Sequence, residues 1–171
     1  NFSLKAKSHR KIYEIVIITI TIKIFYFKIF NFVNCRSLIG TRFLKKEQIM
    51  IEVNDLAPEF TLKNTNKEDV SLSDFSDKVV ILAFYPGAFT GVCDTEMCTL
   101  QENLKTFNTF DATILGISVD SPWANGAFSK NYDLEFELLS DLDRSVIKSY
   151  GVLFTGLGGI DGYTCANRAV F

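Results

Sequence analysis

The sequence predicts an α/β fold in which a central mixed sheet is flanked by helices. An apolar run over residues 79–85 is typical of a buried strand, residues 93–110 carry apolar side chains at helical spacing, and a second strand-like run covers 113–119. A strand, a helix and a strand in this order form a right-handed crossover between two parallel strands. Two short β-type runs around the polar turn 63–69 predict an antiparallel hairpin, which makes the sheet mixed.

The other elements follow in chain order. The predicted elements are a hairpin of 60–62 and 70–72, a turn at 73–75, the strand 79–85, the helix 93–110, the strand 113–119, a helix at 123–132, a short strand at 136–139 and a helix at 143–150. Ser140 or Asp141 introduces the last helix, and Gly151 ends it. The glycine-rich segment 156–159 follows no clear strand and is interpreted as a flexible loop. A final strand begins at Ala169.

The chain joins two segments of opposite charge. Residues 1–49 carry ten basic and two acidic side chains, a net charge of about +8, whereas residues 50–171 carry eight basic and eighteen acidic ones, about −10. The second segment is predicted to be one domain and is large enough to bury one substantial core. Its negative charge argues against binding to nucleic acid.

Three interpretations compete for residues 1–49. The apolar stretch 12–33 has nearly the length of a transmembrane helix, but Lys23 and Lys28 inside it would each cost roughly 2.5–3.5 kcal/mol near the bilayer centre. Basic residues followed by an apolar run also fit a secretory signal, but no small-residue cleavage site follows promptly. We favour the third interpretation, translated upstream sequence with Met50 as the true start, and we expect no membrane partner.

The residue inventory excludes several kinds of chemistry. The single histidine, His9, lies in residues 1–49, so Ser-His-Asp and Cys-His arrangements are excluded for the domain. The chain has four cysteines, which form neither a regular disulfide framework nor the close pairs of a zinc site: Cys35, Cys93, Cys98 and Cys165. We therefore expect no metal and no cofactor.

The most informative segment is the loop that joins the first buried strand to the helix after it, FYPGAFTGVC at residues 84–93. Cys93 falls in the first turn of the helix, where unpaired backbone N–H groups and the helix dipole favour the thiolate, the nucleophilic form of the thiol. Pro86 stiffens the loop, and the Thr90 hydroxyl can donate to the sulfur or accept from it. The pattern predicts an activated cysteine rather than a structural one.

The pattern P-x-x-x-T-x-x-C in this loop resembles the active-site loop of peroxiredoxins, the family that includes the alkyl hydroperoxide reductase peroxidatic subunit and the thiol-specific antioxidants. The resemblance runs from about Val53 to the last residue. It includes APEFTL at 57–62, LGISVDSP at 115–122 and NRAVF at 167–171. It implies a thioredoxin-like fold, and because the family continues with a further strand, a hairpin and a closing helix, we expect the domain to be incomplete at its C-terminus.

The resemblance implies a thiol-dependent peroxidase that reduces hydrogen peroxide and organic hydroperoxides through a sulfenic acid on Cys93, with a role in antioxidant defence and redox homeostasis. By this resemblance, the catalytic residues of this chain are Cys93, Thr90, Arg168 and Pro86. The backbone N–H groups of Val92 and Cys93 are further donors, and Glu96 orients the arginine. Phe89 and Val92 form the substrate pocket.

The spacing C-x4-C resembles the subgroup typified by the bacterioferritin comigratory protein, in which the later cysteine resolves the sulfenic acid into a disulfide. Cα atoms five residues apart in an intact helix are separated by about 8–9 Å, which is too far for a disulfide. Cys98 can therefore resolve only if the first turns of the helix unwind, and otherwise it is a buried apolar residue. Cys165 is another candidate, and an external thiol is the remaining alternative.

Two other functions stay open at this point. A thioredoxin-type thiol–disulfide exchange protein would need C-x2-C at the helix start, where Glu96 stands in place of the second cysteine. A redox sensor could keep the fold without peroxidase turnover. For the peroxidase we expect a thioredoxin-like protein or another thiol as the reductant, a homodimer and a cytoplasmic location.

Overall fold

The structure is a computed structural model that describes residues 51–171, and the predictions made for residues 1–49 and for Met50 lie outside these residues. None of the helices in this part of the chain is long and apolar enough to cross a membrane. With η denoting a 3-10 helix, the elements are β1 (Thr61–Asn64), β2 (Asp69–Ser71), η1 (Leu72–Phe75), β3 (Val79–Phe84), α1 (Gly91–Glu102), α2 (Leu104–Asn108), β4 (Ala112–Ser118), α3 (Pro122–Asn131), β5 (Glu137–Ser140), α4 (Ser145–Ser149), β6 (Leu153–Thr155), η2 (Leu157–Gly159), β7 (Thr164–Ala166) and β8 (Ala169–Val170).

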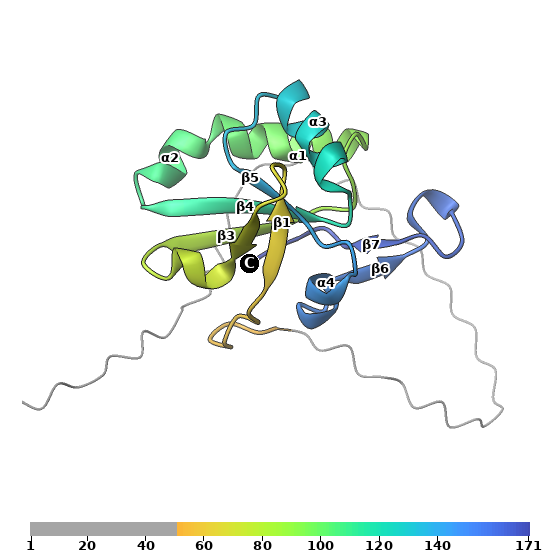
Figure 1. Ribbon diagram of the computed structural model, residues 1–171, viewed down its shortest axis with the longest axis horizontal. Coiled ribbons are helices and arrows are strands. Elements are labelled where there is room, and N and C mark those ends of the chain that lie inside the picture. The colour runs from red at the N-terminus through yellow and green to blue at the C-terminus, as the bar shows by residue number, and fades with distance from the viewer. Residues whose placement is uncertain (1–50) are drawn as a thin grey trace, which may run out of the picture. The chain divides into compact units, whose positions relative to one another are not determined.

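One mixed sheet contains six of the strands, in the order β2-β1-β5-β4-β3-β8. Figure 1 labels the inner four of them, β1, β5, β4 and β3. The central strand β4 is parallel to β3 and to β5. The hairpin strands β1 and β2 pair antiparallel, and β1 is also antiparallel to β5. At the other side β8 pairs antiparallel with β3, with Ala169 opposite Phe84. The predicted hairpin and the predicted parallel crossover are both confirmed.

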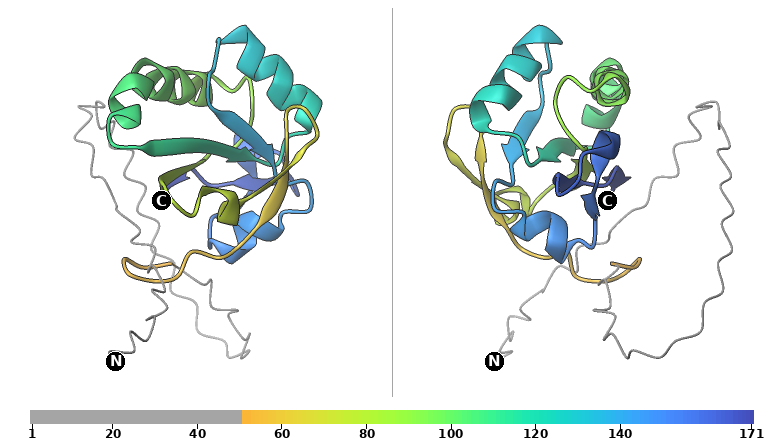
Figure 2. Two further views of the ribbon diagram at one scale, coloured as in Figure 1. Left: turned by 60° about the vertical axis from the view of Figure 1, so that its left-hand side comes forward. Right: turned by 90° about the vertical axis from the view of Figure 1, so that its right-hand side faces the viewer.

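Strand β3 alternates its side chains between two hydrophobic cores, because successive residues of a strand point to opposite faces. Ile81 and Ala83 pack on the face that α1, α2 and α3 cover. Leu82 and Phe84 pack on the other face, with residues of α4 and with Tyr150. The two turned views show the same layering, with α1, α2 and α3 on one side of the sheet and α4 with the β6–β7 pair on the other (Figure 2). The helices thus flank the sheet, as predicted.

The helix predicted over residues 93–110 is two helices, α1 and α2, which meet at Asn103. The Asn103 side chain donates to the Thr99 carbonyl oxygen over 2.8 Å. An asparagine side chain that bonds the nearby backbone competes with regular helical bonding, which is why this residue type favours helix ends. The prediction of one continuous helix was wrong because apolar spacing continues across this break.

Helix α4 begins at Ser145 rather than at the predicted Asp143, because Arg144 adopts a left-handed conformation with φ 64°. The buried Asp141 carboxylate accepts from the N–H groups of Val146 and Ile147 over 3.3 and 2.8 Å. Its pKa is raised, since burial outweighs the opposing effect of these two backbone bonds. The prediction that this position introduces the helix is confirmed, and Gly151 follows the helix with φ 69°.

The glycine-rich segment is the turn of a second hairpin, formed by β6 and β7, and it contains η2. Gly156, Gly158 and Gly159 all have φ values between 64° and 92°. Such values favour glycine, since a Cβ would be strained there. The interpretation as a loop holds for the turn, but the two flanking strands were not predicted because each has only three residues.

Buried tyrosines make the fold sensitive to alkali. Tyr150 is 1% exposed and donates to the Pro58 carbonyl oxygen over 2.9 Å. Burial raises its pKa above the ordinary value of 10.0, and the negative charge of Glu59 adds to the effect. Burial likewise raises the pKa of Tyr85. Above pH 10 the unfolded chain therefore ionises first, the folded chain binds more protons, and stability falls as pH rises.

We expect Tyr150→Phe to make the free energy of unfolding fall less steeply with pH above 10, by up to about 1.4 kcal/mol per pH unit. The measurement is urea unfolding at a series of alkaline pH values. Ser149→Ala is the control, because it removes a hydroxyl that donates to the Val146 carbonyl oxygen but cannot ionise in this range. An unchanged slope in Tyr150→Phe would show that the buried hydroxyl does not carry this dependence.

Candidate functional site

The site lies where β3 ends and α1 begins, at the carboxyl end of a parallel strand pair. Open α/β sheets place their chemistry at this end of the strands. Tyr85 and Pro86 are buried directly after β3, and the chain then becomes exposed at Phe89 and Thr90. Phe89 has φ 58°, a conformation that non-glycine residues adopt uncommonly. A short, constrained loop therefore leads from the buried strand into the helix.

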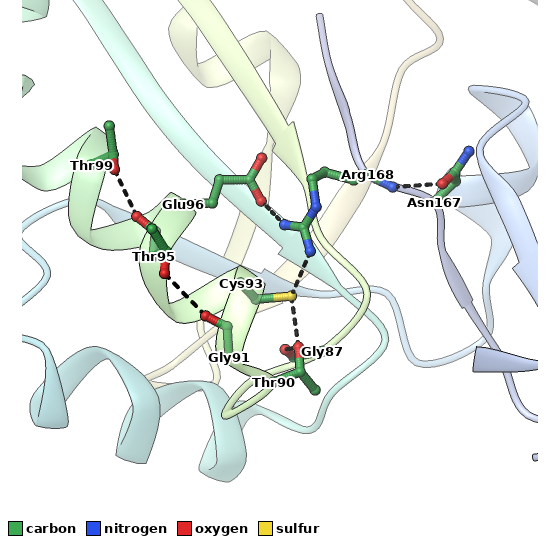
Figure 3. Close-up of polar contacts among 9 residues, drawn as sticks. All are labelled: Gly87, Thr90, Gly91, Cys93, Thr95, Glu96, Thr99, Asn167 and Arg168. Atoms are coloured by element: carbon green, nitrogen blue, oxygen red, sulfur yellow. Dashed lines mark hydrogen bonds and ion pairs between the residues drawn. The ribbon is translucent and has the colours of Figure 1, made fainter. Parts of the chain in front are cut away.

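Cys93 is the third residue of α1 and has no exposed surface. Its backbone N–H donates to the Thr90 carbonyl oxygen, so this N–H is engaged within the turn. Its sulfur lies 2.8 Å from the Thr90 hydroxyl oxygen and 3.3 Å from Nη2 of Arg168 (Figure 3). Two donors from separate elements therefore meet at one buried sulfur atom near the positive end of a helix.

The Thr90 hydroxyl can serve both protonation states of this sulfur. It lies 2.9 Å from the Gly87 carbonyl oxygen as well as 2.8 Å from the Cys93 sulfur, and it has only one proton. Beside a neutral thiol, the hydroxyl can accept from S–H and donate to Gly87. Beside a thiolate, it can turn its proton toward the sulfur. The geometry thus offers a hydrogen bond to the negatively charged form without moving any heavy atom.

Arg168 reaches the cysteine although 75 residues separate them in the sequence. The pairing of Ala169 with Phe84 places Arg168 beside the end of β3, where the loop starts. Burial acts to lower the pKa of Arg168, but the hydrogen bond to Cys93 and the charge of Glu96 outweigh it, so the pKa is raised. The guanidinium is therefore a permanent positive charge at the sulfur.

Glu96 lies one helical turn after Cys93 and forms an ion pair with Nη1 of Arg168 (Figure 3). The glutamate side chain is 20% exposed and the arginine side chain 32%. Burial raises the pKa of Glu96, and the charge and hydrogen bond of Arg168 only partly oppose this shift. The ion pair fixes one edge of the guanidinium and leaves the other nitrogen directed at the sulfur.

Phe89 and Val92 flank the cysteine on the surface, with exposed fractions of 53% and 68%. The Phe89 ring packs edge-on against Phe128 of α3, with ring centroids 5.2 Å apart. The N–H of Val92 has no hydrogen-bond partner among residues 51–171, as is usual in the first turn of a helix. Of the two predicted backbone donors, only the Val92 N–H is free, because the Cys93 N–H already donates to the Thr90 carbonyl oxygen.

The other two cysteines of residues 51–171, Cys98 and Cys165, form no hydrogen bond with Thr90, Cys93 or Arg168. Cys98 is half-buried and has a free thiol, and α1 is unbroken between Cys93 and Cys98. Helical geometry therefore keeps the two Cα atoms about 8–9 Å apart. Cys165 is fully buried in β7, also as a free thiol. Burial raises its pKa, and the charges of Cys93 and Asp120 raise it further, so its nucleophilic form is disfavoured.

Sequence reasoning missed the polar residues beneath the loop. Asp120 follows β4 and accepts a hydrogen bond from the Ala88 N–H over 2.7 Å. Ser118, at the end of β4, donates to the same carboxylate over 3.1 Å. The sequence did contain a signal, because the two polar side chains come where the buried strand β4 ends, next to β3. Their contact with the loop depends on the register of β3 and β4, which the sequence pattern leaves open.

A family model described as the AhpC/TSA family matches residues 53–171 of this chain. Peroxiredoxin Q from Sedum lineare, a chloroplastic protein, is 37% identical over 132 residues, which cover 74% of this chain and 71% of that protein. Peroxiredoxin Bcp from Bacillus subtilis is 36% identical over 102 residues, which cover 60% of this chain and 65% of that protein. The chain thus spans slightly less than two thirds of the length of this bacterial relative.

Solved structures of peroxiredoxins resemble this protein throughout most of the described region. The crystal structure of peroxidoxin BcpB from Mycobacterium tuberculosis matches with a TM-score of 0.62 and 28% identity, over 68% of this chain and 75% of that one. The bacterioferritin comigratory protein of Xanthomonas campestris matches with a TM-score of 0.59 and 25% identity, over 66% and 71%. The predicted thioredoxin-like fold is confirmed, and the chain belongs to the AhpC/TSA family of peroxiredoxins.

Proposed function

We propose that the protein is a thiol-dependent peroxidase, in which Cys93 reduces hydrogen peroxide and organic hydroperoxides. The observation that carries this proposal is the contact of two hydrogen-bond donors, Thr90 and Arg168, with one buried sulfur at a helix N-terminus. The Xanthomonas campestris neighbour supports it, because that protein is described as having alkyl peroxide reduction activity. The family's role in antioxidant defence and redox homeostasis would follow from this reaction.

In the proposed reaction the Cys93 thiolate attacks the terminal oxygen of the hydroperoxide. An S–O bond forms, the O–O bond breaks, and the leaving oxygen departs as water or an alcohol after taking up a proton. The sulfur is oxidised to a sulfenic acid and the peroxide is reduced. Negative charge moves from sulfur to the leaving oxygen, so donors that are directed at this oxygen in the transition state lower the barrier.

Each neighbour of the sulfur then has a role. Thr90 and Arg168 donate to the thiolate in the resting state and to the peroxide oxygens as charge moves, and the free N–H of Val92 is a third donor. Pro86 limits the motion of the loop. Glu96 orients the guanidinium by holding its far edge. Phe89 and the Val92 side chain form the apolar border of the substrate pocket.

The cycle is completed by a second thiol. A thiol condenses with the sulfenic acid to give a disulfide and water, and a reductant then restores the thiolate. We propose Cys98 as the resolving cysteine after the start of α1 unwinds, with an external thiol as the alternative. A thioredoxin-like protein or another small thiol is the proposed reductant, in the cytoplasm, where such systems keep thiols reduced. A homodimer is the proposed assembly.

Cys93→Ser is expected to abolish peroxide consumption, because a serine hydroxyl is neither ionised nor redox-active at neutral pH. The measurement is hydrogen peroxide consumption with dithiothreitol as the reductant. Cys165→Ser is the matched control and should keep the activity, since the proposed reaction does not use that thiol. If the unsubstituted protein consumes no peroxide, a redox sensor with the same fold becomes the better interpretation.

Cys98→Ser tests the resolving step. After one equivalent of peroxide we expect a sulfenic acid on Cys93 that dimedone traps and mass spectrometry detects, whereas the unsubstituted protein should give an intramolecular disulfide. The first turnover should be unaffected, because Cys98 makes no contact with the reacting sulfur. A disulfide from Cys93 to Cys165 in the variant would assign the role to Cys165 instead.

Thr90→Val is expected to lower the second-order rate constant for peroxide by about 100- to 1000-fold, the usual effect of removing one donor from a charge-stabilising site. Valine has nearly the shape of threonine but no hydroxyl. Thr90→Ser keeps the hydroxyl and should retain most of the rate, which distinguishes the donor from the packing of the methyl group. Equal losses in both variants would contradict the assigned role of the hydroxyl.

A further inference from the structure

A single peptide group connects the reactive cysteine to the end of strand β4. The peptide between Gly87 and Ala88 contributes a carbonyl oxygen, which lies 2.9 Å from the Thr90 hydroxyl, and an N–H, which donates to Asp120 Oδ2 over 2.7 Å. In a planar trans peptide the C=O and the N–H point in opposite directions. A hydrogen bond that fixes the N–H therefore also fixes where the carbonyl oxygen points.

The carbonyl oxygen of Gly87 in turn positions Thr90 (Figure 3). The Thr90 hydroxyl lies between this oxygen and the Cys93 sulfur, at 2.9 and 2.8 Å. If the peptide group rotated, the hydroxyl would lose the acceptor that holds its oxygen beside the sulfur when the thiol is neutral. Thr90 itself is exposed and is the residue before α1, so packing alone does not fix its side chain.

Asp120 is itself held in place by a buried polar network. Ser118 donates to Asp120 Oδ2 over 3.1 Å, and the Asp120 N–H donates to the Ser118 hydroxyl over 3.2 Å. The Ser118 hydroxyl is also 3.2 Å from Asn125 Oδ1, which accepts from the Tyr85 hydroxyl over 2.8 Å. The Asn125 amide donates to the Ser140 hydroxyl over 3.1 Å. The network thus joins β4, β5 and α3 to both ends of the segment from Tyr85 to Ala88.

The charge of Asp120 does not explain its position. A carboxylate near a thiolate disfavours the thiolate, since both are negative. Asp120 and Cys93 both act on Tyr163: burial is the main cause that raises the pKa of Tyr163, and the charges of Asp120 and Cys93 raise it further. Asp120 is then useful because its side-chain oxygen accepts a hydrogen bond from the Ala88 N–H, and an oxygen can accept this bond whether or not it is charged.

We propose that Asp120 is a positioning residue for the peroxidase reaction, which acts through the Gly87–Ala88 peptide group to hold the Thr90 hydroxyl on the Cys93 sulfur. This inference rests on the proposed function. It predicts that the acceptor at residue 120 matters and the charge does not. It also predicts that the effect of Asp120 disappears when the Thr90 hydroxyl is absent.

The test is a double-mutant cycle on the second-order rate constant for hydrogen peroxide. Asp120→Ala should lower this rate constant by about 10- to 100-fold. This is the loss expected when a donor, here the Thr90 hydroxyl, is displaced by up to about 1 Å. In the Thr90→Val background the same substitution should change the rate constant less than about threefold, because there is no hydroxyl left to position. Asp120→Asn keeps an oxygen acceptor and should stay within about threefold of the unsubstituted protein.

Two further variants separate positioning from general damage. Asp143→Ala removes another turn carboxylate, which accepts from the Ser145 N–H, and should leave the rate constant unchanged. Asp120→Ser is used in the same cycle if Asp120→Ala does not fold, since its shorter side chain stops short of the Ala88 N–H. Additive losses from Thr90→Val and the Asp120 substitution, or a loss in Asp120→Asn equal to that in Asp120→Ala, would overturn the proposal.

Amide hydrogen exchange at Ala88 tests the anchor without reference to activity. Exchange should be accelerated in Asp120→Ala and remain slow in Asp120→Asn, because only the first variant removes the acceptor. Absence of peroxide consumption by the unsubstituted protein would reject the peroxidase function, while the exchange measurement would still report on the anchor. Equal exchange rates in all three proteins would reject the anchor itself.

Discussion

The proposed reaction requires a thiolate at Cys93, and the need to compensate this buried charge accounts for the arrangement around the sulfur. An ionised group without contact to water costs several kcal/mol unless a partner of opposite charge or hydrogen-bond donors replace the water. Here the sulfur is fully buried and its donors are Thr90 and Arg168. The guanidinium is itself partly buried, so it needs a second partner, and Glu96 provides it. A nucleophilic thiolate at this position therefore requires a chain of three charged groups, in which Arg168 compensates Cys93 and Glu96 compensates Arg168.

This chain of charges depends on how the sheet is assembled. Thr90, Cys93 and Glu96 come from one loop and one helix, so local structure brings them together. Arg168 comes from a distant segment, and only the pairing of β8 with β3 places it there. The sheet is in turn anchored by β3, whose alternate side chains fill two separate cores. Displacing β8 along β3 would move the guanidinium by several ångströms and leave the buried sulfur without its positive partner.

The local part of this site could be predicted from the sequence, and the distant part could not. The position of Cys93 in the first turn of a helix follows from the apolar spacing of residues such as Met97 and Leu100, and the structure agrees. Arg168 and Glu96 were identified by their resemblance to a family motif, since no spacing rule connects residues 72 positions apart. Asp120 lies in a segment that resembles the family, but no role was predicted for it, because its contact with the Ala88 N–H depends on strand register.

The same limit applies to the fold. Strand β3 was predicted within one residue, because its apolar run extends over several pleats, and α3 was predicted within one residue as the helical stretch after Ser121 and Pro122. The strands β6 and β7 have three residues each, too few to establish a period, and they were missed. The break at Asn103 depends on one side chain that bonds the backbone within an otherwise regular pattern. Elements that rest on single contacts are therefore the ones that pattern analysis cannot locate.

The compensated charge also bears on how Cys98 could reach the active sulfur. Both cysteines lie in one helix, so a disulfide between them requires the first turn of α1 to unwind. The contacts that hold this turn include those of Thr90 and Arg168 with the sulfur, and they are strongest while the sulfur is negative. A sulfenic acid is neutral near pH 7, so oxidation weakens the contacts that oppose unwinding. Met97 and Leu100 pack in the core independently of this charge, so we expect such unwinding to stop before them.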